Sequence, residues 1–250
     1  MLVVNQASAQ DIYLETAYMK VEPGGDGEYM ELEEFWKPIH QERINEGNIL
    51  GWFLYSVESP SGSEVHHNYV VVTVYPSFEA TRNSYPEGIW EKVHPGMEWE
   101  EIGARTLAAR DNVRGETWRE IDRIPGTQEE SPAPFLQVGY MKVPMGGAGQ
   151  YLELEELWKK IHETRIADGT LQNWGVYGLR FPAGSGTKYN FAAVSGYEEF
   201  GDLNKFDFAG SVAKANLGME SSELGEMTMS ARENIHSEIW RLIDYVNAPE

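Results

Sequence analysis

The sequence predicts an α+β protein in which two βαββαβ units pack sheet to sheet within one chain. Three observations support this fold class. The chain of 250 residues repeats itself at a constant offset of 122 residues, both copies show the same order of strands and helices, and the strands are apolar on both faces. Solenoid repeats are only about 20–50 residues long, so a period of this length indicates a tandem duplication of a whole domain.

The repeat is clearest in the segment YMKVEPGGDGEYMELEEFWKPIHQERINEG. It begins at Tyr18 and returns as YMKVPMGGAGQYLELEELWKKIHETRIADG at Tyr140. From Tyr18 to Phe78 the copies share 28 of 61 residues without a gap, and the match continues to the last strand of each copy. We expect the first unit, the linker and the second unit at residues 11–125, 126–134 and 135–250.

Within each unit the apolar pattern predicts the order strand, helix, strand, strand, helix, strand. In the first unit we expect these elements at residues 12–21, 29–45, 52–62, 68–75, 97–113 and 117–124. A Gly-rich turn precedes the first helix, Gly47 follows it as a C-terminal cap, and a Pro-Ser-Gly turn joins the second and third strands. This order is the ferredoxin-like split βαβ arrangement, and residues 77–96 fit no single element.

The third strand shows that both faces of the sheet must be covered. Two sets of mainly apolar or aromatic side chains alternate along it: Asn68, Val70, Val72 and Val74 on one face, Tyr69, Val71, Thr73 and Tyr75 on the other. A sheet with one face in water would alternate apolar and polar residues instead. We therefore expect helices on one face and the sheet of the other unit on the second face.

This duplicated arrangement resembles the dimeric α+β barrel superfamily, which includes antibiotic-biosynthesis monooxygenase-like, NIPSNAP-like and stress-responsive barrel domains. In that superfamily two ferredoxin-like units, usually from two chains, pack sheet to sheet. The resemblance covers residues 11–247 and implies an intramolecular version, with barrel pairing satisfied inside one chain and further oligomerisation left open. Several cofactor-free monooxygenases and haem-degrading members use an Asn, Trp and His set. This chain contains all three residue types in a spacing that does not map onto theirs.

The composition excludes several partners and site types. With 20 Lys and Arg against 40 Asp and Glu, the formal net charge of −20 repels nucleic-acid phosphates and anionic lipid. We therefore expect no nucleic-acid partner and no membrane partner, and no run approaches the ~20 apolar residues of a membrane span. The absence of cysteine excludes disulfides and thiolate sites. We expect no metal and no cofactor.

The N-terminus reads MLVVNQASAQDIY, in which Ala7, Ser8 and Ala9 have the small-residue pattern that precedes signal-peptidase cleavage. The apolar core of a signal peptide is missing before them. Residues 1–10 are therefore either a signal-peptide remnant or an ordinary flexible N-terminus. The first alternative predicts a bacterial protein that is periplasmic or secreted, and the second predicts a cytoplasmic one.

An arginine lies on the apolar stripe of the first predicted helix. At about 100° per residue, Arg43 falls in the middle of this stripe, with His40 on its edge one turn from Trp36. The same pattern returns in the second unit with Arg165, His162 and Trp158. A core-facing arginine keeps its charge and needs an acceptor. That acceptor is either a group of the protein or an acidic ligand in a pocket.

His40 and His162 are the candidate catalytic residues. A neutral imidazole can act as a base near pH 7, and the alternative is a hydrogen-bonded structural group beside a tryptophan. Neither helix has the His-x-x-x-His or Glu-x-x-His spacing of a metal site. The motif VHHN at residues 65–68 returns as TKYN. Its two histidines are therefore either part of a surface loop or a site kept in one half only.

We predict a ligand pocket between the first helix and the sheet of each unit. The expected ligand-binding residues are Tyr18, Lys20, Trp36, His40, Arg43 and Asn68, and in the second unit Tyr140, Lys142, Trp158, His162, Arg165 and Asn190. The two asparagines are included because asparagine is unfavourable in a strand. Aromatic, cationic and amide side chains together suit an aromatic or acidic small molecule.

The sequence therefore predicts a small-molecule-binding barrel protein and leaves open whether it is an enzyme. One alternative is a cofactor-independent monooxygenase or isomerase acting on an aromatic or polyketide-like substrate. Another is a haem-handling protein. Binding ranks first because no acid–base constellation in the sequence is specific.

Overall fold

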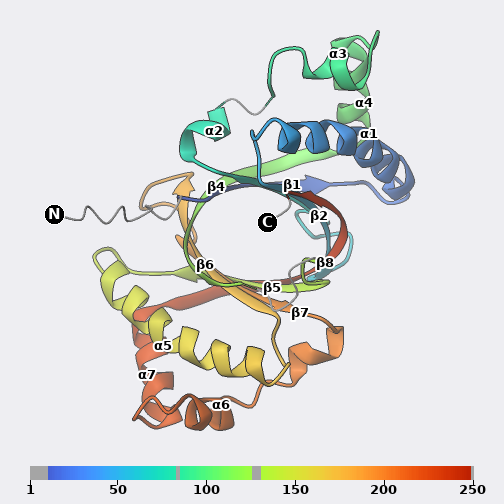
Figure 1. Ribbon diagram of the computed structural model, residues 1–250. Coiled ribbons are helices and arrows are strands. Elements are labelled where there is room, and N and C mark those ends of the chain that lie inside the picture. Colours follow the sequence, from blue (N-terminus) through green and yellow to red (C-terminus); the bar gives the residue numbers. More distant parts are fainter. Residues whose placement is uncertain (1–10, 83–84, 126–130, 249–250) are drawn as a thin grey trace, which may run out of the picture.

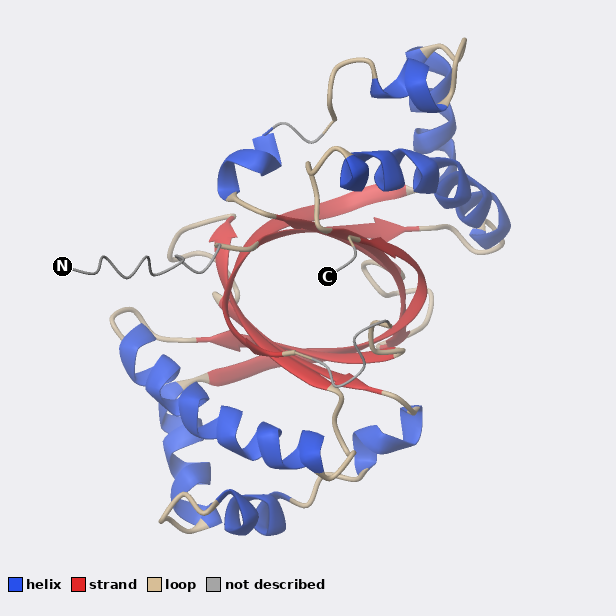
Figure 2. Cartoon of the chain, viewed as in Figure 1, coloured by secondary structure: helices blue, strands red, loops and turns tan. Residues whose placement is uncertain are grey.

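The centre of the molecule is a closed barrel of eight β-strands. The computed structural model describes residues 11–82, 85–125 and 131–248 of the chain. Helices lie outside the barrel on two opposite sides (Figure 1 and Figure 2). The predicted N-terminal segment, residues 1–10, and residues 126–130 of the predicted linker lie outside the described residues.

Both halves of the chain follow the same order of elements. The first half contains β1 (Tyr13–Lys20), α1 (Asp26–Asn45), β2 (Gly51–Ser59), β3 (Tyr69–Tyr75), α2 (Phe78–Arg82), α3 (Ile89–Val93), α4 (Trp99–Ala109) and β4 (Asp111–Ile124). The second half contains β5 (Phe135–Lys142), α5 (Ala148–Ala167), β6 (Asn173–Phe181), β7 (Phe191–Tyr197), the 3-10 helix η1 (Phe200–Asn204), α6 (Phe208–Ala215), α7 (Ser221–Ala231) and β8 (Glu233–Asn247). Each half is thus a βαββαβ unit with additional short helices before its last strand.

Two long strands close the barrel because each changes its partner along its length. The first part of β4 pairs antiparallel with β1 and the second part with β6. The first part of β8 pairs with β5 and the second with β2. The order around the barrel is β1-β3-β2-β8-β5-β7-β6-β4. The predicted fold class, two ferredoxin-like units packed sheet to sheet in one chain, is therefore confirmed.

The two faces of each sheet belong to different cores, because side chains alternate along a strand. In β1, Thr16 and Tyr18 line the barrel interior, whereas Ala17 and Met19 pack in the cluster beneath α1. The interior cluster contains residues of both halves. The apolar character of both strand faces thus reflects one core inside the barrel and further cores beneath the helices.

The last strand of the first half is longer than the sequence predicts. The helix expected over 97–113 ends at Ala109, and β4 begins at Asp111 rather than at Thr117. The extra length pairs with β1, a contact between distant segments that a local apolar pattern does not contain. The unassigned residues 77–96 contain the short helices α2 and α3.

Candidate functional site

The residues predicted to bind a ligand lie on both faces of the sheet. Those on α1 and α5 lie outside the barrel, where His40 and His162 stack on Trp52 and Trp174 of the outer sheet face: Trp36, His40, Arg43, Trp158, His162 and Arg165. Tyr18 and Tyr140 instead point into the barrel interior from β1 and β5. The predicted set therefore does not line one pocket, because the sheet separates its members.

Arg43 is buried, as its place on the apolar stripe predicts, with 1% of its surface exposed. Its Nη1 lies 3.0 Å from Nδ1 of His40, and its Nη2 donates to the Tyr75 hydroxyl at 3.1 Å. Tyr75 donates in turn to the Glu15 carboxylate at 2.8 Å, and the guanidinium packs 4.4 Å from the ring centroid of Tyr85. The buried cation is thus held by internal polar and aromatic groups.

His40 lies between two indole rings, with its ring centroid 4.8 Å from that of Trp52 and 6.1 Å from that of Trp36. Burial and the charge of Arg43 lower the pKa of His40 well below its ordinary value. The imidazole is therefore neutral, and its Nδ1 accepts a hydrogen bond from the guanidinium of Arg43. Since a general base works best with a pKa near the operating pH, this environment favours a structural role.

The second half repeats this arrangement. The ring of His162 lies 5.3 Å from Trp174 and 5.7 Å from Trp158, and Nη1 of Arg165 lies 3.4 Å from its Nδ1. Burial, with a smaller contribution from Arg165, lowers the pKa of His162 to about 3. Trp158 is half-buried, as is Trp36 in the first half.

The neutral state of His162 makes the stability of the protein depend on pH. In the unfolded chain its imidazole takes up a proton as the pH falls below about 6.5, whereas the folded pKa is about 3. The unfolded state binds more protons between these two pKa values. The titration of His162 should therefore lower the free energy of unfolding by up to about 1.4 kcal/mol for each unit by which the pH is lowered. The variant His162→Asn keeps an acceptor oxygen for Arg165 and removes this titration.

Urea unfolding at several pH values between these two pKa values measures the effect. We expect His162→Asn to be less stable than the wild type, through lost ring stacking, but to depend less steeply on pH. The same substitution at the exposed His66 is the control for removing an imidazole elsewhere in the chain. An unchanged slope in His162→Asn would contradict the assignment of a buried neutral imidazole.

The predicted asparagine and lysine residues contact the backbone. The side chain of Asn68 accepts from the amide of Val21 at 2.8 Å and donates to its carbonyl oxygen at 2.9 Å. Lys20 donates to the carbonyl oxygen of Val65 at 2.9 Å. The equivalent contacts of the second half are Asn190 with Val143 and Lys142 with Thr187. These residues therefore connect the ends of β1 and β5 by hydrogen bonds to the segments that precede β3 and β7.

A cavity of about 520 Å³ occupies the barrel interior. Its walls are mainly apolar and aromatic side chains from both halves, among them Leu14, Phe53, Val74, Trp118, Leu136 and Val194. Gly175 stands at the position equivalent to Phe53, 122 residues further along the chain. A Cβ atom at Gly175 would lie 2.8 Å from the Tyr177 hydroxyl, so glycine lets this ring lie against the backbone.

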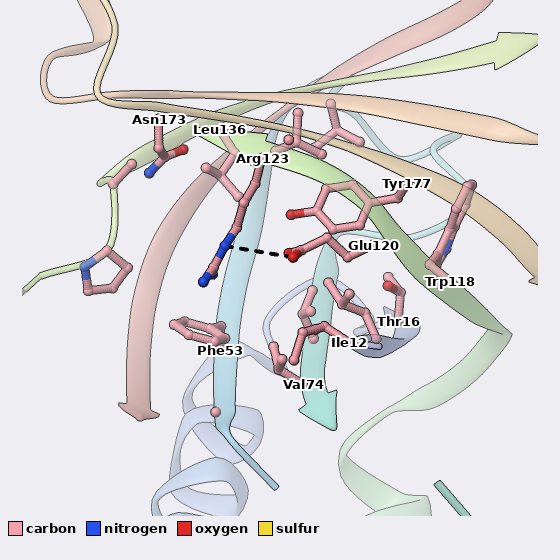
Figure 3. A pocket seen from close by; sticks show the side chains of 18 of the residues that line it. Ile12, Thr16, Phe53, Val74, Trp118, Glu120, Arg123, Leu136, Asn173 and Tyr177 are labelled. Atoms are coloured by element: carbon pink, nitrogen blue, oxygen red, sulfur yellow. Dashed lines mark ion pairs between the residues drawn. The ribbon is translucent and has the colours of Figure 1, made fainter. Parts of the chain in front are cut away.

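One end of the cavity is lined by residues 131–133 and 247–248 and by two charged side chains. Figure 3 shows Arg123 and Glu120 pointing toward one another there, with Nε and Oε1 separated by 3.7 Å. Burial raises the pKa of Glu120 more than Arg123 lowers it. An anionic ligand that approached Arg123 at this end would therefore also meet the carboxylate of Glu120.

Two hydrogen-bonded tyrosines form part of the cavity wall inside the barrel. The hydroxyls of Tyr18 and Tyr140 lie 2.9 Å apart, and both residues line the cavity. Tyr18 also donates to Oε2 of Glu116 at 2.9 Å, and Tyr189 donates to Oε1 at 2.6 Å. Nε of Arg114 lies 3.4 Å from Oε1. The buried Glu116 carboxylate thus receives donors on both oxygens.

Glu238 occupies the position equivalent to Glu116 in the second half and has different partners. Trp240 donates to its Oε2 at 2.8 Å, and Nε2 of His67 lies 3.2 Å from the same oxygen. Nε2 of His236 lies 3.6 Å from Oε1. Burial alone would raise the pKa of Glu238, but the donors on His236, His67 and Trp240 outweigh it and lower the pKa to about 2. His67, from the VHHN motif, thereby joins the first half to a carboxylate of the second.

Neither Glu116 nor Glu238 is among the site residues that the sequence predicts. They recur at the offset of 122 residues in GETW and SEIW, each two residues before a tryptophan. This recurrence is the pattern that points to them. Because the predicted helix over 97–113 and the strand from Thr117 leave Glu116 between elements, the sequence alone gives it no partner. The VHHN motif contains one buried histidine, His67, and one exposed histidine, His66.

The described residues form no metal cluster, and the described lining of the barrel cavity does not fit a haem. Across residues 11–82, 85–125 and 131–248 no cluster of three or more His, Cys, Asp or Glu side chains is arranged to hold a metal. The described cavity lining contains no histidine, methionine or cysteine as an axial ligand. Burial raises the pKa of the tyrosines that line it, which disfavours phenolate ligation: Tyr18, Tyr55, Tyr140 and Tyr177. In the same part of the chain, no helix is long and apolar enough to cross a membrane.

Solved structures with similar folds cover nearly the whole chain. A candidate monooxygenase from Fusobacterium nucleatum is 13% identical, with a TM-score of 0.58 over 96% of this chain and 95% of its own. An anthrone oxidase-like protein is 9% identical, with a TM-score of 0.54 over 97% and 95%. A variant of chlorite dismutase from Candidatus Nitrospira defluvii is 8% identical, with a TM-score of 0.52 over 95% and 93%.

No protein-family model and no curated protein matches the sequence. At the low identities of the solved structures, the likeness shows the fold alone. That fold is the dimeric α+β barrel, as the sequence predicts.

Proposed function

We propose that the protein binds a small, largely apolar and aromatic molecule inside the barrel. The observation that carries this proposal is the cavity of about 520 Å³, walled by aliphatic and aromatic side chains of both halves. Ligand pockets have volumes of about 300–1,000 Å³ and combine such walls with a few polar groups. Because Arg123 already faces Glu120, these contacts favour a neutral ligand over an acidic one.

A cofactor-independent monooxygenase or isomerase is the second candidate. The hydrogen-bonded chain of Tyr140, Tyr18 and Glu116 favours it, because it connects the cavity wall to a buried carboxylate. The fold shared with a candidate monooxygenase and an anthrone oxidase-like protein is consistent with it. Haem handling has less support, because the described cavity residues offer no axial ligand. Haem addition without a Soret band would argue against it.

Filling the cavity should weaken ligand binding. The variant Gly175→Phe gives the second half the residue that the first half has at Phe53, inside the cavity. The neutral fluorophore Nile red should gain fluorescence with the wild type, and its affinity for Gly175→Phe should fall by about tenfold or more. Fluorescence titration measures both values.

A second cavity-filling variant, Val194→Phe, guards against distortion, since a Cβ at Gly175 displaces the Tyr177 ring. The control Met229→Phe adds an equal ring at an exposed position of α7 and should leave binding unchanged. Binding that is equally strong in all folded variants would exclude the barrel cavity as the ligand site.

A further inference from the structure

The contacts of Glu116 have a fixed direction. Its oxygens face the hydroxyl of Tyr18 at 2.9 Å, the hydroxyl of Tyr189 at 2.6 Å and Nε of Arg114 at 3.4 Å. Each neighbour can donate a proton, and the guanidinium cannot accept one. The carboxylate therefore accepts from both tyrosine hydroxyls and lies within ion-pair distance of the guanidinium, and Tyr18 uses its single proton toward it.

This direction continues to Tyr140. The Tyr18 and Tyr140 hydroxyls are 2.9 Å apart, and the Tyr18 proton is already used toward Glu116. Tyr140 must therefore donate to the Tyr18 oxygen. Burial raises the pKa of both tyrosines well above the ordinary value, so both stay protonated. The Tyr140 oxygen is left with lone pairs and no proton for a molecule in the cavity.

The surroundings of Tyr140 favour a ligand that donates a hydrogen bond to its oxygen over one that does not. Tyr140 is 1% exposed and lies in the interior core cluster, where its ring is 6.3 Å from that of Trp118. A polar ligand atom placed there without a partner loses its hydration and gains no hydrogen bond. An acceptor atom on the ligand would also face the lone pairs of Tyr140. A hydroxyl or N–H group would extend the chain toward the Glu116 carboxylate.

We propose that Tyr140 determines ligand specificity by accepting a hydrogen bond, so that the cavity takes neutral aromatic molecules with a hydroxyl or N–H donor. This inference rests on the proposed function, since it requires the ligand to occupy the barrel. The preferred chemical class is phenols and aromatic N–H compounds. The corresponding aryl ethers lack the donor, and phenolates lack the proton and bring a charge toward Glu116.

The test compares 4-nitrophenol with 4-nitroanisole, which has a methyl group in place of the phenolic proton. Each displaces Nile red from the protein at a pH at which free 4-nitrophenol is neutral. We expect the phenol to bind about tenfold more tightly, as for a hydrogen bond that leads to a charged group. Tyr140→Phe should bring the two affinities within about twofold of each other. The control Tyr55→Phe, which removes another hydroxyl of the lining, should keep the preference.

Two further measurements keep the result decisive. Glu116→Gln replaces the carboxylate by an amide that can also donate, so the preference for the phenol should shrink even if Tyr140→Phe fails to fold. Raising the pH until 4-nitrophenol ionises should weaken its binding to the wild type, and tighter binding of the phenolate would overturn the proposal. Equal binding of both probes overturns this inference alone. Failure of both probes and of Nile red to bind overturns the proposed function.

Discussion

Replacement of Glu238 by leucine is expected to lower the free energy of unfolding by about 3–5 kcal/mol. The Glu238 side chain is buried and receives Trp240 Nε1 at 2.8 Å and His67 Nε2 at 3.2 Å. Leucine has a similar volume but no acceptor, so the N–H groups of Trp240 on β8 and of His67 in the loop before β3 would lose their partner. Leaving a buried donor unsatisfied costs its full desolvation penalty. Equilibrium urea unfolding, followed by circular dichroism, measures the difference.

The control for this prediction is Glu238→Gln. The amide keeps one acceptor oxygen for Trp240, so we expect a loss smaller than that of Glu238→Leu. A double variant with His67→Phe should recover part of the loss, because it removes one of the orphaned donors. If Glu238→Leu were as stable as the wild type, the contacts of Glu238 could not be stabilising the fold.

The variant Trp52→Ala is expected to destabilise the protein by about 3–5 kcal/mol. Trp52 is 1% exposed and packs between the ring of His40 and the core beneath α1. Removing the indole leaves a cavity and also removes one of the two rings that enclose the neutral imidazole. Thermal and urea unfolding measure the effect, and an unchanged midpoint would contradict the packing described for α1.

Trp36→Ala is the matched control, because Trp36 stacks on the other face of the same imidazole. Trp36 is half-buried, as is Trp158, whereas Trp52 is 1% exposed. Part of the Trp36 indole already contacts water, so less apolar area is lost on truncation. We expect Trp36→Ala to cost clearly less than Trp52→Ala, and the reverse order would contradict the assigned burial.

The fold could be predicted because its evidence is repeated and regular. A gapless offset of 122 residues and apolar residues on both strand faces require a second sheet over the first. The burial of Arg43 also follows from the sequence, because a helical wheel fixes which side chains share a face. The sequence does not give its neighbours, since Tyr75 and Tyr85 come from other segments.

The barrel network could not be predicted in the same way. Its members are brought together by strand pairing across the two halves, so Tyr189 meets Glu116 and His67 meets Glu238. Local patterns also misplace the start of β4, which hides Glu116 between two elements. The direction in which Tyr18 and Tyr140 point is decided by alternation along a strand, and the sequence does not say which face the helix covers.

The difference between Phe53 and Gly175 has a consequence for the kind of ligand that the barrel can hold. Two identical chains joined about a two-fold axis present an isologous surface, in which each residue is duplicated on the opposite side. Such a cavity would carry two copies of Phe53 or two copies of Gly175, and would offer a bound molecule two indistinguishable orientations. Because both halves belong to one polypeptide, a residue on one side of the axis is free to differ from its counterpart. The cavity can therefore fix a molecule that has no two-fold axis of its own in a single orientation.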